Sequence, residues 1–134
     1  MRILVLAFLV LSAALPVRAQ TAEEAIRGVI DSQLDAFAAD DFATAFGFAS
    51  DPLQRFFVSP ENFRQMVENG YQMVIRPRDV RYGSAEPEGG YVWQKVFITD
   101  SSGALYTLRY QMIPTSEGPR INAVEIIPGH ELAA

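Results

Sequence analysis

The stretch that decides the fold is SPENFRQMVENGYQMVIRP, residues 59–77. Ser59 followed by Pro60 is typical of a helix start, because a serine side chain caps the first free backbone donors and proline fits the first turn. Asn69 and Gly70 predict the helix end, with glycine in the left-handed conformation of a C-terminal cap. From Tyr71 onward the pattern changes to that of strands, so this stretch separates a helical half from a strand half.

Two further helices are expected before this stretch. Thr21 with Glu24 forms a capping box, which predicts a helix that ends near Ala39. Asp41 is a candidate N-cap for a second helix, and residues 53–57 are expected to form one short turn after Pro52. The apolar residues of the first helix recur at helical spacing: Ile26, Ile30, Leu34 and Phe37.

Residues 71–127 are rich in β-branched and aromatic side chains and contain three short turn clusters. Strands are expected at residues 73–75, 79–85, 91–99, 104–113 and 120–127. Alternation assigns three inner sets to the helix-covered face, one from each of the last three strands. These sets are Val92, Gln94, Val96 and Ile98; Ala104, Tyr106, Leu108, Tyr110 and Met112; and Asn122, Val124 and Ile126. The predicted fold class is therefore α+β, with three N-terminal helices packed on a curved antiparallel sheet.

Residues 1–19 have the form of a signal peptide. Arg2 precedes an apolar run from Ile3 to Leu15, and a small-residue site ends at Ala19. The run is shorter than the about 20 residues of a membrane-spanning helix, which disfavours the competing interpretation of a retained anchor and predicts no stable membrane span. We expect cleavage after Ala19, a periplasmic or secreted location, and a single domain over residues 20–134 with a short C-terminal tail.

Composition excludes several classes of function. Without Arg2 and Arg18, the remaining chain has nine basic and 16 acidic residues, a formal charge of −7 that repels nucleic acids. The chain has no cysteine and a single histidine, His130, so thiol chemistry is excluded and no metal site is indicated. Nothing in the sequence indicates a cofactor.

Four runs carry a resemblance to a known family: DAFAADDFATAFGFAS, SPENFRQMVENGYQMVIRP, KVFITDSSGALYTLRYQM and GPRINAV. They resemble domain-of-unknown-function family 4864, a bacterial family of small exported domains within the nuclear transport factor 2-like, cystatin-like cone superfamily. The chain departs from that family at Pro119 and Ala123, where relatives tend to have tryptophan and glycine. The resemblance implies the cone fold but no activity, because the wider superfamily includes isomerases and dehydratases as well as binding and dimerisation modules.

The inner sets suggest a pocket for a small apolar or amphipathic ligand, since apolar concavities with a few polar groups are the usual form of such sites. The competing interpretation is that the polar side chains satisfy only one another. An isomerase or hydro-lyase is the alternative function, but the inner sets contain no Asp or Glu that could act as acid or base, and no catalytic residue is assigned. The candidate pocket residues are Gln33, Tyr71, Gln94, Tyr106, Tyr110 and Asn122.

The outward residues of the strands suggest a surface for a protein partner. Trp93 and Phe97 are expected there beside Arg109, and aromatic residues with arginine are enriched at interface cores. Such a surface could join two copies through their sheets. The alternative is that the face assignment of residues 91–99 is inverted and Trp93 belongs to the core.

Overall fold

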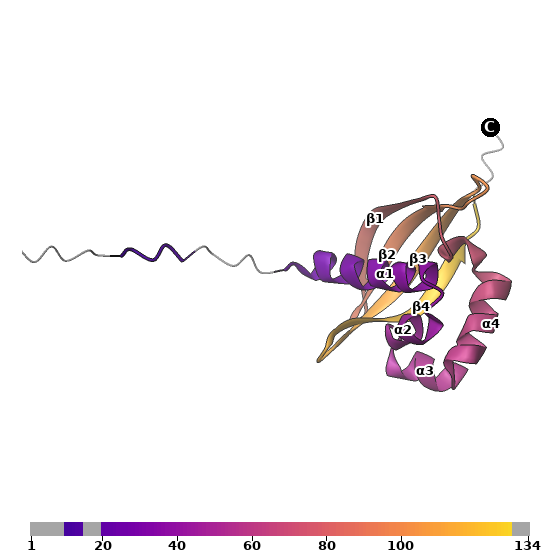
Figure 1. Cartoon of the computed structure of the whole chain (residues 1–134), viewed down its shortest axis with the longest axis horizontal. Helices are drawn as coiled ribbons and strands as arrows, with labels where there is room; N and C mark the ends of the chain where they lie inside the picture. Colours follow the sequence, from indigo (N-terminus) through magenta and orange to yellow (C-terminus); the bar gives the residue numbers. More distant parts are fainter. Residues whose placement is uncertain (1–9, 15–19, 130–134) are drawn as a thin grey trace, which may run out of the picture.

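The computed structural model describes residues 10–14 and 20–129, and in it a helical N-terminal half packs against one sheet (Figure 1). The predicted cleavage site at Ala19 and the tail residue His130 lie outside the described residues. No helix within the described ranges is both long enough and apolar enough to cross a membrane. The helical elements are α1 (Ala22–Ala38), α2 (Phe42–Gly47), α3 (Asp51–Phe57), α4 (Pro60–Gly70) and the 3-10 helix η1 (Gln72–Val74).

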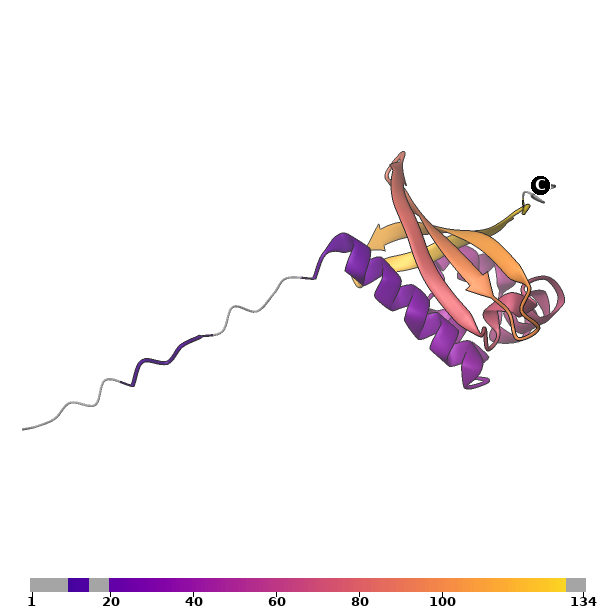
Figure 2. The ribbon, with the colours of Figure 1, turned by 90° about the horizontal axis from the view of Figure 1, so that it is seen from above.

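The sheet has four antiparallel strands in the order β1-β2-β3-β4. The strands are β1 (Asp79–Glu88), β2 (Tyr91–Thr99), β3 (Leu105–Thr115) and β4 (Gly118–Ile127). The sheet is curved, and α1 lies across one of its faces (Figure 2). Helices followed by a curved antiparallel sheet confirm the predicted α+β class.

The core lies between α1 and the inner face of the sheet. Ile30 of α1 is fully buried against the strand residues Val96 and Leu108, which are also fully buried. Phe37, Phe42, Phe46 and Phe63 extend this core between α1, α2 and α4 through close ring contacts. The chain has no disulfide, so this apolar burial is the main source of its stability.

The predicted helix starts are confirmed at three positions, where a side-chain oxygen accepts a hydrogen bond from the third following backbone N–H. These caps are Thr21, Asp41 and Ser59. The expected turn at residues 53–57 is instead part of α3, with Ser50 as N-cap, so residues 20–77 contain four α-helices rather than three. Pro52 lies in the first turn of α3, where its missing N–H removes no helical hydrogen bond.

Two predictions near the helix-to-strand junction are wrong. The helix α4 ends at Gly70 as predicted, but Gly70 does not have the positive φ of a left-handed cap, and the C-cap is Tyr71 with φ −135°. The strand expected at residues 73–75 is replaced by η1, whose Met73 and Val74 are buried. Three apolar residues show no period that separates a strand from a helical turn, which explains the second error.

The predicted inner faces of β2 and β3 are confirmed within these strands, because Gln94, Val96, Leu108 and Tyr110 are all buried, whereas Ala104 precedes β3 and is exposed. In β4 the prediction holds only in part. A β-bulge shifts the register between Gln111 and Met112, so that Met112 pairs with Ile121 while Gln111 pairs with Ala123. As a result Ile121 is buried as well, whereas Ile126, near the end of the strand, is 37% exposed.

Candidate functional site

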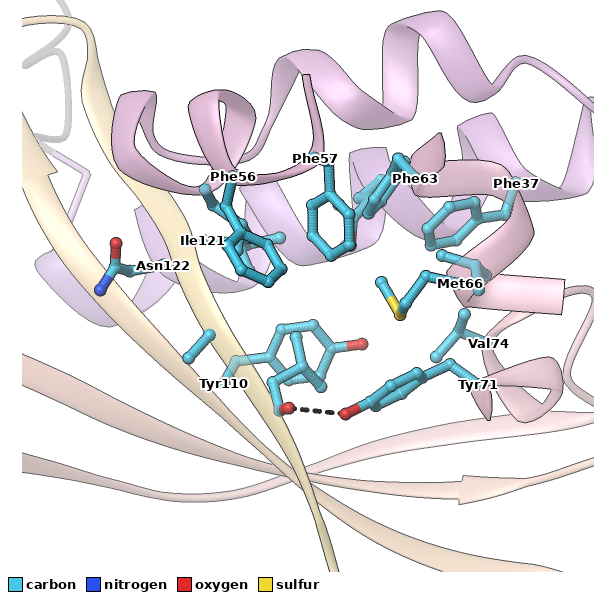
Figure 3. A pocket seen from close by; sticks show the side chains of 15 residues that line it. Phe37, Phe56, Phe57, Phe63, Met66, Tyr71, Val74, Tyr110, Ile121 and Asn122 are labelled. Carbon is cyan, nitrogen blue, oxygen red and sulfur yellow. Dashed lines mark hydrogen bonds between the residues drawn. The ribbon is translucent and has the colours of Figure 1, made fainter. Parts of the chain in front are cut away.

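A cavity of about 330 Å³ lies between the helices and the inner face of the sheet, and we call it the inner cavity. Figure 3 shows aromatic side chains of α1, α3 and α4 on one side and residues of β3 and β4 on the other. The lining residues are Gln33, Phe37, Leu53, Phe56, Phe57, Phe63, Met66, Val67, Tyr71, Val74, Tyr110, Ile121, Asn122, Ala123 and Val124.

The local sequence explains how these side chains reach the cavity. The bulge in β4 adds one residue opposite β3, so that Ile121 and Asn122 both contribute to the lining. The start of β4 also pairs with the segment between α2 and α3, because Ser50 N–H donates to Ile121 O over 2.7 Å and Ile121 N–H donates to Phe48 O over 2.9 Å. These bonds fix α3 beside β4, and α3 then supplies Phe56 and Phe57 to the cavity.

Four of the six candidate pocket residues line the inner cavity: Gln33, Tyr71, Tyr110 and Asn122. Gln94 does not. Its side chain is fully buried, and Nε2 donates to Gly83 O over 3.0 Å and to Lys95 O over 2.9 Å, while Oε1 has no partner. Gln94 thus binds the irregular part of β1, where the register shifts between Tyr82 and Ala85. Tyr106, partly buried on the core, also lies outside the lining.

The aromatic wall of the cavity was missed in the sequence. Phe56 is 77% exposed although it lines the cavity, and its ring meets that of Phe57 edge to face with centroids 5.1 Å apart. Phe57 in turn contacts Phe63 of α4, with centroids 5.6 Å apart. The available signal was the pair of adjacent phenylalanines in a short helix. Successive residues of a helix point in different directions, so the pair indicates that one ring remains partly exposed.

The environment of Tyr110 is strongly apolar. Its side chain is 1% exposed, and its hydroxyl points into the inner cavity (Figure 3). Burial, with a smaller contribution from nearby Tyr71, raises the pKa of Tyr110 above its ordinary value, so the phenol stays protonated and can donate a hydrogen bond.

One tyrosine, Tyr82, contacts a carboxylate outside the inner cavity. Tyr82 of β1 donates a hydrogen bond from its hydroxyl to the carboxylate of Asp31 on α1, and neither residue lines the inner cavity. Burial, followed by this hydrogen bond, raises the pKa of Tyr82. Among the described residues, no three His, Cys, Asp or Glu side chains gather in a group that could hold a metal ion.

The other face of the sheet carries the residues considered for a partner. Arg109 stacks over Trp93 with its guanidinium carbon 4.0 Å from the ring centroid, and its Nη2 lies 2.8 Å from Glu125 Oε2. Phe97, on the same face of β2, is 42% exposed. Trp93 therefore lies on the outer face and not in the core; we define this outer face by Trp93, Lys95, Phe97, Arg109 and Glu125.

The chain is similar to a described protein family and, in its fold, to a solved structure. Residues 19–134 match the family described as Domain of unknown function (DUF4864). No curated protein matches the chain. The fold is similar to the crystal structure of an NTF-2 like protein of unknown function from Burkholderia xenovorans LB400, with a TM-score of 0.46 and 16% sequence identity over 81% of this chain and 91% of that chain.

Proposed function

The chain belongs to the DUF4864 family, and we propose that it is an exported, non-enzymatic module that binds a small apolar or amphipathic molecule in the inner cavity. The observation that carries this proposal is the cavity itself, whose volume of about 330 Å³ falls within the range of about 300–1,000 Å³ typical of small-molecule sites. Replacing water by an apolar ligand against this aromatic and aliphatic lining is favourable, because apolar surface is removed from water.

The residues of the lining favour binding over catalysis. An isomerase or hydro-lyase needs a positioned acid or base at the reacting carbon, and in most enzymes this is a carboxylate, histidine or lysine. The lining contains none of these residue types, and its ionisable groups are the phenols of Tyr71 and Tyr110. The acid that contacts a tyrosine, Asp31, lies outside the cavity.

Native mass spectrometry of the protein purified from the periplasm of its own host tests the proposal. We expect a mass above that of the mature chain, which denaturation releases as a small molecule. Met66 lies in the lining and points into the cavity (Figure 3), so Met66→Trp, which adds bulk there, is the matched control and should carry no added mass. If the wild-type protein carries no ligand and also fails to bind added butylbenzene, the proposal is wrong.

Self-association through the outer face is a second candidate function. The exposed Phe97 lies near the stacked pair of Trp93 and Arg109, the kind of aromatic and arginine cluster that is enriched at interface cores. Both signs of charge occur on this face, in Lys95 and Arg109 and in Glu125, so that like charges do not oppose the pairing of two copies. We propose a homodimer in which the outer faces of two sheets meet.

A further inference from the structure

The polar groups of the inner cavity differ in how many hydrogen bonds they can still make to a ligand. Asn122 is held between two protein groups, because Oδ1 accepts from Ser50 Oγ over 2.7 Å and Nδ2 donates one of its two hydrogens to Gln111 Oε1 over 2.8 Å. The hydroxyl of Tyr71 donates to Val124 O over 3.0 Å. The hydroxyl hydrogen of Tyr71 is therefore committed to the protein, and Asn122 has one N–H left.

Gln33 and Tyr110 complete the polar lining. Gln33 donates from Nε2 to Ala45 O over 3.1 Å, and this bond holds the side chain against α2. Tyr110 is different, because its hydroxyl makes no hydrogen bond to any residue in 10–14 or 20–129. A hydroxyl that faces the cavity without a protein partner can bond there only to water, and an acceptor placed in the cavity would take the place of that water.

The charge of the ligand follows from the same lining. None of the 15 lining residues is Asp, Glu, Lys, Arg or His. An ionised group inside the cavity would therefore be taken out of water without a counter-charge, which is strongly unfavourable. The part of the ligand that enters the cavity has to be neutral.

The size of the ligand follows from the volume. The cavity of about 330 Å³ is roughly twice the size of an engineered 150 Å³ cavity that binds benzene. With about 30 Å³ for each water-sized group, it holds roughly ten to twelve non-hydrogen atoms.

We infer that the ligand is an uncharged, largely apolar molecule of roughly ten to twelve non-hydrogen atoms with one acceptor oxygen, such as a ketone or ester carbonyl, to which Tyr110 donates a hydrogen bond. This inference rests on the proposed function, because it assigns a chemistry to the ligand of the same cavity. Tyr110 is the specificity-determining residue in this assignment, and the apolar wall supplies most of the affinity.

Three probes of similar shape test the inference by isothermal titration calorimetry: 4-phenylbutan-2-one, butylbenzene and 4-phenylbutanoate. We expect Tyr110→Phe to weaken binding of the ketone by roughly 2- to 10-fold, the effect of one hydrogen bond, and to leave binding of butylbenzene unchanged. The carboxylate should bind the wild-type protein at least about tenfold more weakly than the ketone at pH 7.

Tyr106→Phe is the matched control, because it removes the same hydroxyl from the same strand outside the cavity lining, and it should change the affinity for neither neutral probe. Circular dichroism checks that both variants fold. The inference is overturned if Tyr110→Phe and the wild-type protein bind the ketone equally well, or if the carboxylate binds more tightly than the ketone. In either case, binding of butylbenzene would still support the cavity as a binding site. If no probe binds, the inference falls together with the proposed function.

Discussion

The hydroxyl of Ser50 donates a hydrogen bond to Asn122 Oδ1 over 2.7 Å, and so joins two residues that are 72 positions apart. The same Oγ accepts a hydrogen bond from Leu53 N over 3.2 Å and caps α3. Ser50 is fully buried. One side chain therefore begins α3 and holds it to β4 at the wall of the inner cavity.

Ser50→Ala should lower the free energy of unfolding by about 2–3 kcal/mol, because it removes both the cap and the bond to Asn122. Urea denaturation measures the loss. Ser59→Ala is the control: the Ser59 hydroxyl caps α4 through Asn62 N over 3.2 Å and makes no hydrogen bond to the described strands, so its loss should cost about 1 kcal/mol. Equal losses for the two variants would contradict the dual role of Ser50.

The two tyrosines of the cavity should respond differently to removal of their hydroxyls. Tyr71→Phe loses the hydrogen bond to Val124 O and should lower the free energy of unfolding by about 1 kcal/mol. Tyr110→Phe loses no hydrogen bond to the protein and should leave stability of the free protein unchanged or slightly raised. Thermal denaturation of the two variants side by side checks this order, and a larger loss of stability for Tyr110→Phe would refute it.

Gln94→Met tests the role that the structure gives to the buried amide. Met keeps the length of the side chain but cannot donate to Gly83 O and Lys95 O, so we expect a loss of about 1–3 kcal/mol. Hydrogen exchange should also become faster in β1 near Gly83. The exposed Gln72, which makes no side-chain hydrogen bond, provides the control: Gln72→Met should change stability by less than about 0.5 kcal/mol.

Stability should fall at alkaline pH. Burial raises the pKa of Tyr82 and of Tyr110 in the folded protein, whereas tyrosines of the unfolded chain ionise near about pH 10. Above that pH the unfolded chain binds fewer protons than the folded chain, so the contribution of both phenols is complete below about pH 10 and decreases as the pH rises further.

Urea midpoints measured between about pH 8 and 11 follow this decrease. Tyr110→Phe should show a shallower decline than the wild-type protein. Tyr91, which is 43% exposed, supplies the control, and Tyr91→Phe should decline as steeply as the wild type. The expectation fails if the curves of wild type and Tyr110→Phe are parallel.

The proposed homodimer predicts that Phe97→Asp shifts the protein to a monomer in sedimentation equilibrium, because it replaces the exposed apolar ring of the outer face by a charge. Val58→Asp is the control. Val58 is 78% exposed, lies away from the sheet after α3, and has φ +74°, which aspartate tolerates better than valine does. A wild-type protein that stays monomeric at high concentration would exclude the dimer.

Local signals predicted the helix starts but not every helix. The caps at Thr21, Asp41 and Ser59 depend on neighbours within three residues, and the sequence displays those directly. Ser50 was overlooked because Pro52 was interpreted as a helix stop, although proline is compatible with a first turn. The alternation in β2 and β3 was equally informative, since these two strands pair with each other in one unbroken register.

Features that depend on distant pairing could not be predicted in the same way. The bulge in β4 breaks the alternation and places Ile121 in the core, and no residue type near Asn122 predicts a bulge there. Gln94 was assigned to the cavity because it lies on the inner face, but irregular pairing in β1 presents it with the carbonyl of Gly83. Tyr110 was predicted as a polar residue of the cavity, whereas the phenylalanines of α3 that make up its wall were not predicted.

The pairing of Ile121 with the segment before α3 has a consequence for how the protein is made. The last strand contributes residues 121–124 to the cavity and holds α3 through the bond from Ser50 N–H to Ile121 O. A growing chain that has not yet reached β4 lacks both, and contacts between residues so far apart in sequence form late in folding. The inner cavity is therefore completed only after β4 has been synthesised.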